Sequence, residues 1–569
     1  MSKNQIHDED VLGSAMSSEK PPPPGEISSS KAPEKVSEAS TSENQEPVPQ
    51  EKALPILSLI LIGAALWFSI FLITLDGTIV ANAIPTITDE FHKISDVGWY
   101  GSAYLLTQAA FQLLYGKIYA KFSIKYTFIA AIFLFELGSL VCALAPNSTA
   151  LIIGRAVSGL GGAGVTSGSM TIIAYSVPLR LRPLFIASFG IVFAVSSVCG
   201  PLLGGVFTSK LTWRWCFYIN LPFGGFTILA IFLVLKEPNR PELDTISLKK
   251  KLQSIDFLGT LLFVPAIVCL LLALQWGGSK YSWSNGRIIA LLVLFGLLSI
   301  AFIAFQHWKG EEATLVLRLL AGRSVLAAAW YGFCNGGAMT LLVYYIPFWH
   351  QVIHGVSAVD SGIRLLPFMI GVVITVMLAG AIVSKFGYYT IFLILSSIIT
   401  PIGEGLLTTW KVDTGFSQWV GYQALIGLGI GLGQQQPLVA IQNVVPKAEI
   451  ASGTAIVMLV QLLSGSIFVS VGQAVLQNKL VENLAKAFSG RSDFDPSQIA
   501  NAGATDVLSI VPVDDLPAVL EAYNNALVQV YTVALVLSAL TIFGSVAMEW
   551  KSVKKEAEKP SELEGSSDK

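Results

Sequence analysis

Gly200-Pro201-Leu202-Leu203-Gly204-Gly205 is the stretch that decides the fold, and it lies in an apolar segment from Arg182-Pro183 to about Lys210. Three glycines and a proline destabilise a helix in water. In lipid they are useful, because Gly200 and Gly204 lie four apart on one face and let a neighbouring backbone approach closely. Pro201 removes a hydrogen bond and bends the helix. The stretch therefore predicts a kinked membrane helix whose smooth face, Gly205 included, is either a hinge or a site of tight static packing.

The composition of the chain is that of a membrane protein. Of its 569 residues, 53% are hydrophobic and only 13% are charged, whereas ordinary soluble domains carry roughly 25% charged residues. We therefore expect an all-α polytopic membrane protein. The formal net charge is -2, and the sequence has no stripe of basic residues away from the membrane flanks. This distribution argues against a nucleic-acid-binding protein.

The sequence lacks the patterns of a catalytic or metal site. The five cysteines are scattered through apolar runs without metal-ligand spacing, so we interpret them as small buried hydrophobes. No Gly-rich phosphate loop or Ser/His/Asp set lies where it could act. We expect a protein that is not an enzyme, that uses no metal or cofactor, and that acts as a monomer.

The chain divides into tails and spanning segments. Residues 1–52 are rich in Ser, Glu and Pro without an apolar period, which predicts a disordered tail. A window of roughly 20 apolar residues gives about fourteen spanning runs, at 54–84, 97–120, 125–145, 150–174, 183–208, 216–235, 255–275, 287–306, 323–349, 361–383, 387–409, 418–440, 451–475 and 525–548. The predicted division is a six-helix bundle at 53–236, a linker with two extra helices at 237–310, a second six-helix bundle at 311–549 with a partly helical external loop at 476–524, and a tail at 550–569.

Lys and Arg in the connections predict the orientation. With an even number of spans, both termini share the side that carries most basic residues, including Lys117, Lys121, Lys125, Arg180 and Arg182. This excess predicts cytoplasmic termini. We expect a multi-pass protein of the plasma membrane, with the vacuolar membrane as the alternative. Asn147-Ser148-Thr149 is a glycosylation sequon on the outer side, which we expect to stay unmodified because it lies so close to the membrane.

An internal repeat links the two predicted bundles. Gly116-x-Ile118-x-x-Lys121-Phe122 recurs in the second bundle as Gly380-x-Ile382-x-x-Lys385-Phe386. Arg155-x-x-x-Gly159-x-Gly161 recurs at nearly the same offset as Gln423-x-x-x-Gly427-x-Gly429. Parallel repeats of this kind place a substrate cavity at their interface, near the bilayer midplane.

Three ionisable residues in the first bundle are functional candidates, because charges are costly within a membrane. Asp76 lies in the outer part of the first span, and Arg155 lies about one and a half turns inside the outer end of the fourth. An ion pair between them either couples proton binding to movement or fixes two helices. Glu136, in the middle of the third span, either carries a proton or stays neutral and bonds a neighbouring helix. Glu404 is a weaker candidate, because Pro401 beside it breaks the helix near water.

Uncharged polar side chains are the candidates for lining a substrate cavity. Such groups orient a mostly apolar ligand without demanding a particular charge. Each of them can equally serve as a polar contact between helices. The candidates are Gln108, Gln112, Asn335, Tyr344, Gln434 and Gln435.

Several of these segments resemble one family. The run Leu75-Asp76-Gly77-Thr78-Ile79-Val80-Ala81-Asn82-Ala83-Ile84-Pro85 resembles the first-helix signature of the fourteen-span drug:proton antiporters of the major facilitator superfamily. The run from Arg155 to Gly164 is similar to their fourth-helix motif, and Gly200 to Gly205 matches their fifth-helix antiporter motif. Trp213 to Pro222 looks like the stretch that leads into their sixth helix. The resemblance implies the major facilitator fold, with two six-helix bundles and two inserted central helices, and implicates Arg155 in proton coupling.

The loop after the second span departs from the superfamily pattern. Gly116, Lys121 and Lys125 match it, but Ala120 replaces the usual aspartate and Ile124 the usual arginine. This departure puts the acidic-basic cytoplasmic latch of the superfamily in doubt. The variant, with the run around Glu136, resembles the fungal branch that exports toxins and secondary metabolites.

We therefore predict a proton-coupled antiporter that exports an amphipathic small molecule by alternating access. Its partners would be that substrate, protons and the lipid bilayer. A second hypothesis is a carrier for a compact polar solute such as a basic amino acid, which would need acidic groups in its cavity. A third, a membrane receptor or scaffold, would need neither the repeat nor a buried Asp/Arg pair.

Overall fold

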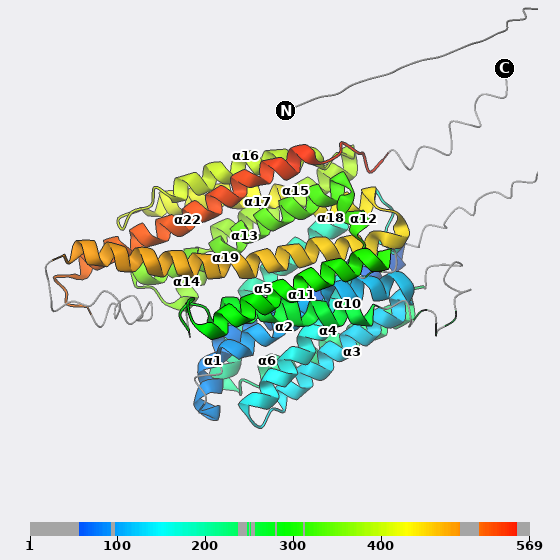
Figure 1. Ribbon diagram of the computed structural model, residues 1–569, viewed down its shortest axis with the longest axis horizontal. Coiled ribbons are helices and arrows are strands. Elements are labelled where there is room, and N and C mark those ends of the chain that lie inside the picture. Colours follow the sequence, from blue (N-terminus) through cyan, green and yellow to red (C-terminus); the bar gives the residue numbers. More distant parts are fainter. Residues whose placement is uncertain are drawn as a thin grey trace, which may run out of the picture. The chain divides into compact units, whose positions relative to one another are not determined.

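The computed structural model describes residues 56–92, 97–236, 256–278, 281–310, 315–489 and 511–554, and the isolated positions 247, 249, 251 and 313. The predicted tail at 1–52, residues 490–510 of the predicted external loop and residues 555–569 of the second tail lie outside these ranges. The described chain is built from helices (Figure 1), which confirms the all-α class.

The helices of the first third of the chain pack on one another. They are α1 (Ile56–Phe91), α2 (Val97–Lys121), α3 (Ile124–Ala143), α4 (Ser148–Ser176), α5 (Arg182–Lys210), α6 (Trp215–Tyr218) and α7 (Asn220–Val234). α4 packs against α2 and α3, and α1 packs against α5 and α7. Side-chain caps begin two of them, because Ser123 accepts a hydrogen bond from the N–H of Tyr126, and Asn147 accepts one from the N–H of Ala150.

A second group follows the same plan. It comprises α12 (Leu317–Ala321), α13 (Arg323–His354), α14 (Ala358–Arg364), α15 (Leu366–Phe386), α16 (Thr390–Leu407), α17 (Phe416–Gly433), α18 (Gln436–Val444), η3 (Lys447–Glu449), α19 (Ile450–Ala487) and α22 (Leu516–Ala547). α17 packs against α15 and α16, and α13 packs against α19 and α22. Gly355 and Gly387 end α13 and α15 at φ 61° and 95°, where a glycine avoids strain. α19 and α22 extend beyond the expected limits of 475 and 525.

Close glycine contacts recur in both groups, in the register of the sequence repeat. Gly159 of α4 abuts the backbone of Tyr104 on α2, and Gly427 of α17 abuts the backbone of Phe368 on α15. Tyr104 and Phe368 are as far apart along the chain as Gly116 and Gly380 are. The repeat therefore extends from sequence to helix packing.

Two helices are inserted between the groups. α10 (Phe257–Trp276) and α11 (Gly286–Lys309) form a hairpin, and α10 packs on α2 and α19 (Figure 1). The rings of Trp99 and Trp276 lie 6.1 Å apart. The buried carboxylate of Asp256 closes the hairpin, because it accepts a hydrogen bond from Gln306 Nε2 at 2.7 Å and pairs with Lys309 Nζ at 3.2 Å.

Twelve segments of the described chain are long and apolar enough to cross a membrane. α2 and α5 are not among them but have 25 and 29 residues, which suffices at about 1.5 Å per residue for a hydrocarbon core of about 30 Å. The protein is a multi-pass membrane protein, and the count of fourteen spans stays a prediction.

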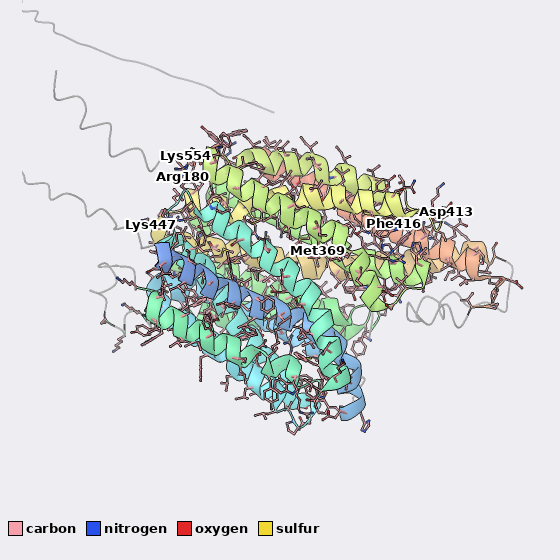
Figure 2. All side chains as sticks on the ribbon, turned by 180° about the vertical axis from the view of Figure 1, so that it is seen from behind. Arg180, Met369, Asp413, Phe416, Lys447 and Lys554 are labelled. Carbon is pink, nitrogen blue, oxygen red and sulfur yellow. The ribbon has the colours of Figure 1, made fainter. Side chains whose placement is uncertain are left out.

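The bundle has two distinguishable ends. Figure 2 shows Arg180, Lys447 and Lys554 at one end and Asp413 and Phe416 at the other. We call the first the basic end and the second the opposite end.

The two groups touch along two seams near the basic end. At the first seam, Gly116 of α2 lies against Ala451, Ser452 and Ala455 of α19. At the second, Gly380 of α15 lies against Pro183 and Ala187 of α5. Farther from the basic end, a cavity of about 360 Å³ lies between α5 and α15, lined by residues such as Val195, Cys199 and Met369. The groups are therefore in closest contact at the basic end.

Candidate functional site

Asp76 of α1 and Arg155 of α4 form a buried ion pair. Their side chains are 0% and 1% exposed, and Arg155 Nη1 donates to Asp76 Oδ2. The Nε of Arg155 donates to the backbone oxygen of Tyr100 at 2.7 Å. A buried pair loses several kcal/mol when one partner is removed, because the other charge stays desolvated. A change of protonation at this pair therefore has a large energetic effect.

Other side chains complete the site around this pair. Asn220, at the start of α7, donates to Asp76 Oδ1 at 3.3 Å and to Ser139 Oγ at 3.1 Å. The guanidinium of Arg155 lies 4.6 Å from the ring centre of Tyr104, within cation–π range. Asn220 lies in the Trp213–Pro222 stretch noticed in the sequence, but its role as a partner of Asp76 was not predicted.

Glu136 of α3 lies close to this cluster without bonding to it. Its side chain is buried, and among the described residues neither carboxylate oxygen has a hydrogen-bond partner. The carboxyl packs against Gly224 of α7, where any larger residue would overlap it. Ser139, which bonds Asn220, lies one turn farther along α3. Glu136 is thus a buried acid with unused bonding capacity beside the ion pair.

The predicted cavity amides fall into two sets, one in each group of helices. Gln112 Nε2 of α2 donates to Ser167 Oγ at 2.8 Å and contacts Met458 Sδ of α19 at 3.6 Å. Gln108, one turn away, donates to Thr166 Oγ1 at 3.5 Å. The Gln112 contact therefore bridges the α2–α19 seam.

The second set lies where α17 gives way to α18. Asn335 Nδ2 of α13 donates to Gln434 Oε1 at 2.5 Å, and Gln435 is half-buried beside it. Tyr344 of α13 is 58% exposed, and its ring lies 5.2 Å from that of Tyr345. The structure pairs Asn335 with Gln434 and leaves Tyr344 on a surface.

The glycine stretch of α5 packs within its own group. A side chain at Gly200 would overlap Thr78 of α1, whereas Gly205 has open space around it. Gly204 is buried, and Pro201 lies inside the helix. The part of α5 that touches the second group lies nearer the basic end, at Pro183, Ala187 and Gly190. The glycine stretch suggested as a hinge therefore contacts α1, whereas another part of the same helix forms the second seam with α15.

Lysine side chains on either side of the turn between α2 and α3 donate hydrogen bonds to backbone oxygens. Lys125 Nζ donates to the backbone oxygen of Phe232 at 2.6 Å, and Lys117 Nζ donates to that of Ala313 at 2.8 Å. Lys121 is half-buried at the end of α2. Across the second seam, Arg180 Nε donates to the backbone oxygen of Ser384 at 3.3 Å.

The second group lacks an arginine at the position equivalent to Arg155. Gln423 of α17, which takes the place of Arg155 in the repeat, is buried with its Nε2 3.4 Å from His350 Nε2 of α13. Glu404 of α16 corresponds to Glu136 at the same offset and is also buried, although the sequence predicted that it would reach water. Within the described ranges, neither His350 Nδ1 nor Gln423 Oε1 has a hydrogen-bond partner. In the described part of the chain, the buried Asp–Arg ion pair is therefore recorded in the first group and not in the second.

Similarity to known proteins identifies the family. A family model described as Major Facilitator Superfamily matches residues 66–469. The chain is 48% identical over 88% of its length to the "MFS-type efflux pump MFS1" of Arthroderma benhamiae, of which the match covers 92%. It is 46% identical to the "MFS-type transporter astH" of Aspergillus oryzae, over 90% of each chain. It is also 46% identical to the "Efflux pump aflT" of Aspergillus parasiticus, over 88% of this chain and 96% of that one.

Solved structures support the fold. The human organic anion transporter MFSD10 matches with a TM-score of 0.52 at 12% identity, covering 84% of this chain and 99% of that one. The proton:xylose symporter XylE matches with a TM-score of 0.52 at 15% identity, covering 82% and 98%. The fungal relatives confirm the resemblance to the efflux branch noted in the sequence. The chain therefore belongs to the major facilitator superfamily, whose members transport small molecules.

Proposed function

We propose that this protein is a proton-coupled antiporter that exports an amphipathic small molecule, such as a toxin, secondary metabolite or drug, by alternating access. Fungal relatives at 46–48% identity are named efflux pumps, which supports the direction of transport. The observation that carries the proposal is the fully buried Asp76–Arg155 pair, completed by Asn220.

Proton binding at Asp76 is the proposed trigger. Protonation removes the negative partner of Arg155 and leaves a buried cation, which costs about 3–5 kcal/mol when uncompensated. Glu136 is an acid on the adjacent α3 whose oxygens have no partner. In this scheme Arg155 turns from Asp76 toward Glu136, and α1, α3 and α4 shift with it.

The contacts at the two seams are the proposed pivots of the movement. The groups of helices meet at Gly116 and Gly380 near the basic end, while a cavity separates α5 from α15 farther away. Rocking about these contacts opens either end in turn. Gln112, Asn335 and Gln434 are proposed to orient the cargo between the groups.

The proposed topology follows from the distribution of basic residues. The basic end faces the cytoplasm, by the excess of Lys and Arg there. The chain crosses the membrane fourteen times as two six-helix bundles with α10 and α11 between them. We propose a monomer in the plasma membrane.

Proton-driven uptake into reconstituted vesicles tests the proposal. A fluorescent amphipathic cation and a basic amino acid are offered to vesicles with an imposed pH gradient. Asp76→Asn is expected to abolish gradient-driven accumulation of the amphipathic compound and to retain exchange without a gradient. Asp360→Asn, at an exposed acid of α14, is the control and should accumulate normally. Full gradient-driven accumulation by Asp76→Asn would contradict the coupling role, and accumulation of the amino acid alone would favour the carrier of polar solutes.

A further inference from the structure

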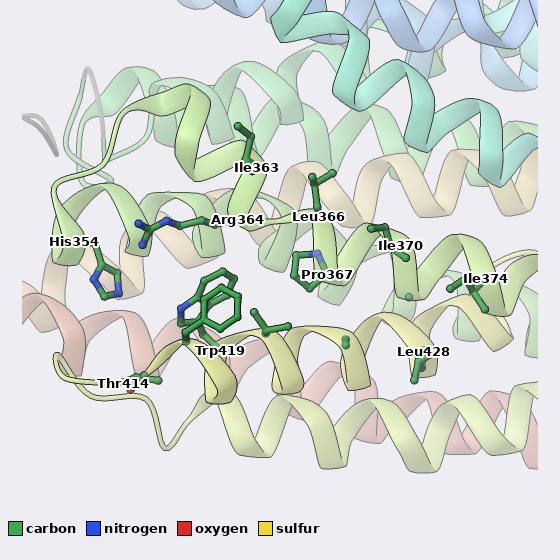
Figure 3. Close-up of a pocket in the computed structure, with 15 residues that line it drawn as sticks. His354, Ile363, Arg364, Leu366, Pro367, Ile370, Ile374, Thr414, Trp419 and Leu428 are labelled. Carbon is green, nitrogen blue, oxygen red and sulfur yellow. The ribbon is translucent and has the colours of Figure 1, made fainter.

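A large groove lies at the opposite end of the bundle, outside the proposed proton site. It has a volume of about 960 Å³ and runs between α14, α15 and α17. Figure 3 shows Arg364, His354 and Thr414 toward one end and Ile370, Ile374 and Leu428 toward the other. The groove therefore has a polar, cationic end and an apolar end.

Arg364 gives the polar end its charge. Its guanidinium lies 5.9 Å from the ring centre of Trp419, which is buried and forms a wall of the groove. Among the described residues, the structure records no ion pair for Arg364. The nearby acid Asp360 accepts a hydrogen bond from Ser357 instead. Arg364 thus offers a fork of donors suited to a phosphate.

The apolar end lies on spanning helices. Ile370 and Ile374 of α15 are 53% and 48% exposed in the isolated chain, so lipid chains would cover them in a bilayer. From Leu366 to Ile374 α15 rises roughly 12 Å, and one leaflet of the hydrocarbon core is about 15 Å thick. The apolar part of the groove therefore matches the length of an acyl chain in one leaflet.

The groove also borders the cavity between α5 and α15. Leu366, Ile370 and Ile374 border both this groove and the cavity between α5 and α15. A chain lying along these residues would therefore also border the cavity between the two groups of helices.

We propose that this groove binds an anionic phospholipid, with its phosphate on Arg364 and one acyl chain along α15 toward the cavity between α5 and α15. The site is separate from the Asp76–Arg155 pair and goes beyond the proposed transport function. The positive charge favours a phosphate group, and the exposed isoleucines favour a chain from the surrounding bilayer over a water-soluble anion.

Native mass spectrometry of the intact detergent-solubilised protein tests the proposal. The protein is incubated with equal amounts of phosphatidylglycerol and phosphatidylcholine, and the retained lipids are counted. Wild type is expected to retain one phosphatidylglycerol in preference to phosphatidylcholine. Arg364→Gln is expected to weaken that retention about tenfold, in line with the loss of a charge-assisted hydrogen bond.

Two further variants separate a specific site from general effects. Arg287→Gln is the matched control, because Arg287 also lies against an aromatic ring, Tyr281 at 5.0 Å, but lines no part of this groove. It should retain the lipid. Ile374→Trp fills the apolar end while keeping Arg364, and it should lose the lipid. The proposal is overturned by equal retention in wild type and Arg364→Gln, by equal loss in Arg287→Gln, by retention in Ile374→Trp, or by displacement with soluble phosphate alone.

Discussion

Replacing Gly116 by alanine should push the two groups of helices apart at the basic end. A Cβ at this position would lie 2.7 Å from the Cβ of Ala455 and 3.2 Å from the backbone oxygen of Ala451. Carbon atoms in contact normally lie about 3.5–4.0 Å apart, so α19 must withdraw by about 1 Å. Neither obstacle can rotate away, because both are fixed to the backbone of α19.

The cost falls mainly on the conformation in which the basic end is closed. Overpacking of this kind costs about 1–3 kcal/mol, which corresponds to a change of about five- to 150-fold in an equilibrium. The conformation with an open basic end does not contain the contact and gains population. Export should fall, because the transporter then spends less time open at the opposite end.

Distances between spin labels at Tyr126 and Lys385, which are exposed near the basic end on different groups, measure this change. Gly116→Ala should increase the population at the longer distance. The double variant Gly116→Ala/Ala455→Gly removes the overlapping methyl group and should restore the original distribution. Gly205→Ala is the control, because nothing lies within 4 Å of a Cβ there. Unchanged distances in Gly116→Ala, or no recovery in the double variant, would refute the reasoning.

Three other predictions follow from buried or paired charges. Glu136→Gln keeps the shape of the buried side chain but removes its charge, so gradient-driven accumulation in vesicles should be lost while exchange persists; full accumulation would exclude Glu136 from coupling. Asp256→Ala removes the acceptor of the α10–α11 hairpin, and each lost charged hydrogen bond should cost about 1.5–3 kcal/mol; a thermal melt unchanged from wild type would contradict this, with Asp360→Asn as the control. The hydrogen bond from Arg214 lowers the pKa of Glu90, so the folded pKa lies below the unfolded one. The stabilisation is present above the unfolded pKa of about 4.3 and is lost as the pH falls through the lower folded value. The difference in melting temperature between wild type and Glu90→Gln should therefore be small, since the pair is solvent-exposed, and should vanish at low pH; a difference that grows on acidification would contradict it.

The sequence was sufficient to predict that Asp76 and Arg155 lie at the same level of the bundle and can pair, because that level follows from distance along each helix. It could not predict Asn220 as their third partner, because that contact depends on how α7 is rotated against α1. The same limit applies to the glycine stretch of α5. Its spacing predicted close packing, but only the three-dimensional arrangement shows that Gly200 meets α1.

The contact that Gln423 makes in the second group could not be predicted from the sequence. The repeat makes Gln423 the equivalent of Arg155. The sequences of α1 and α13 show no match that would make His350 the equivalent of Asp76. The structure brings His350 and Gln423 within 3.4 Å. Helix ends were misjudged for a different reason, because polar residues continue α19 to Ala487 beyond its apolar run.

The α10–α11 hairpin adds two helices to the chain, which is an even number. Two added crossings return the chain to the side of the membrane from which it started. The second group of helices therefore keeps the orientation that it would have without the insertion. In the described chain, the main contacts of the insertion with the two groups are made by α10 with α2 and α19, at the first seam. The two flanks of the molecule are therefore unequal, and a hydrophobic compound diffusing within the bilayer would meet an obstructed flank on one side and an accessible one on the other.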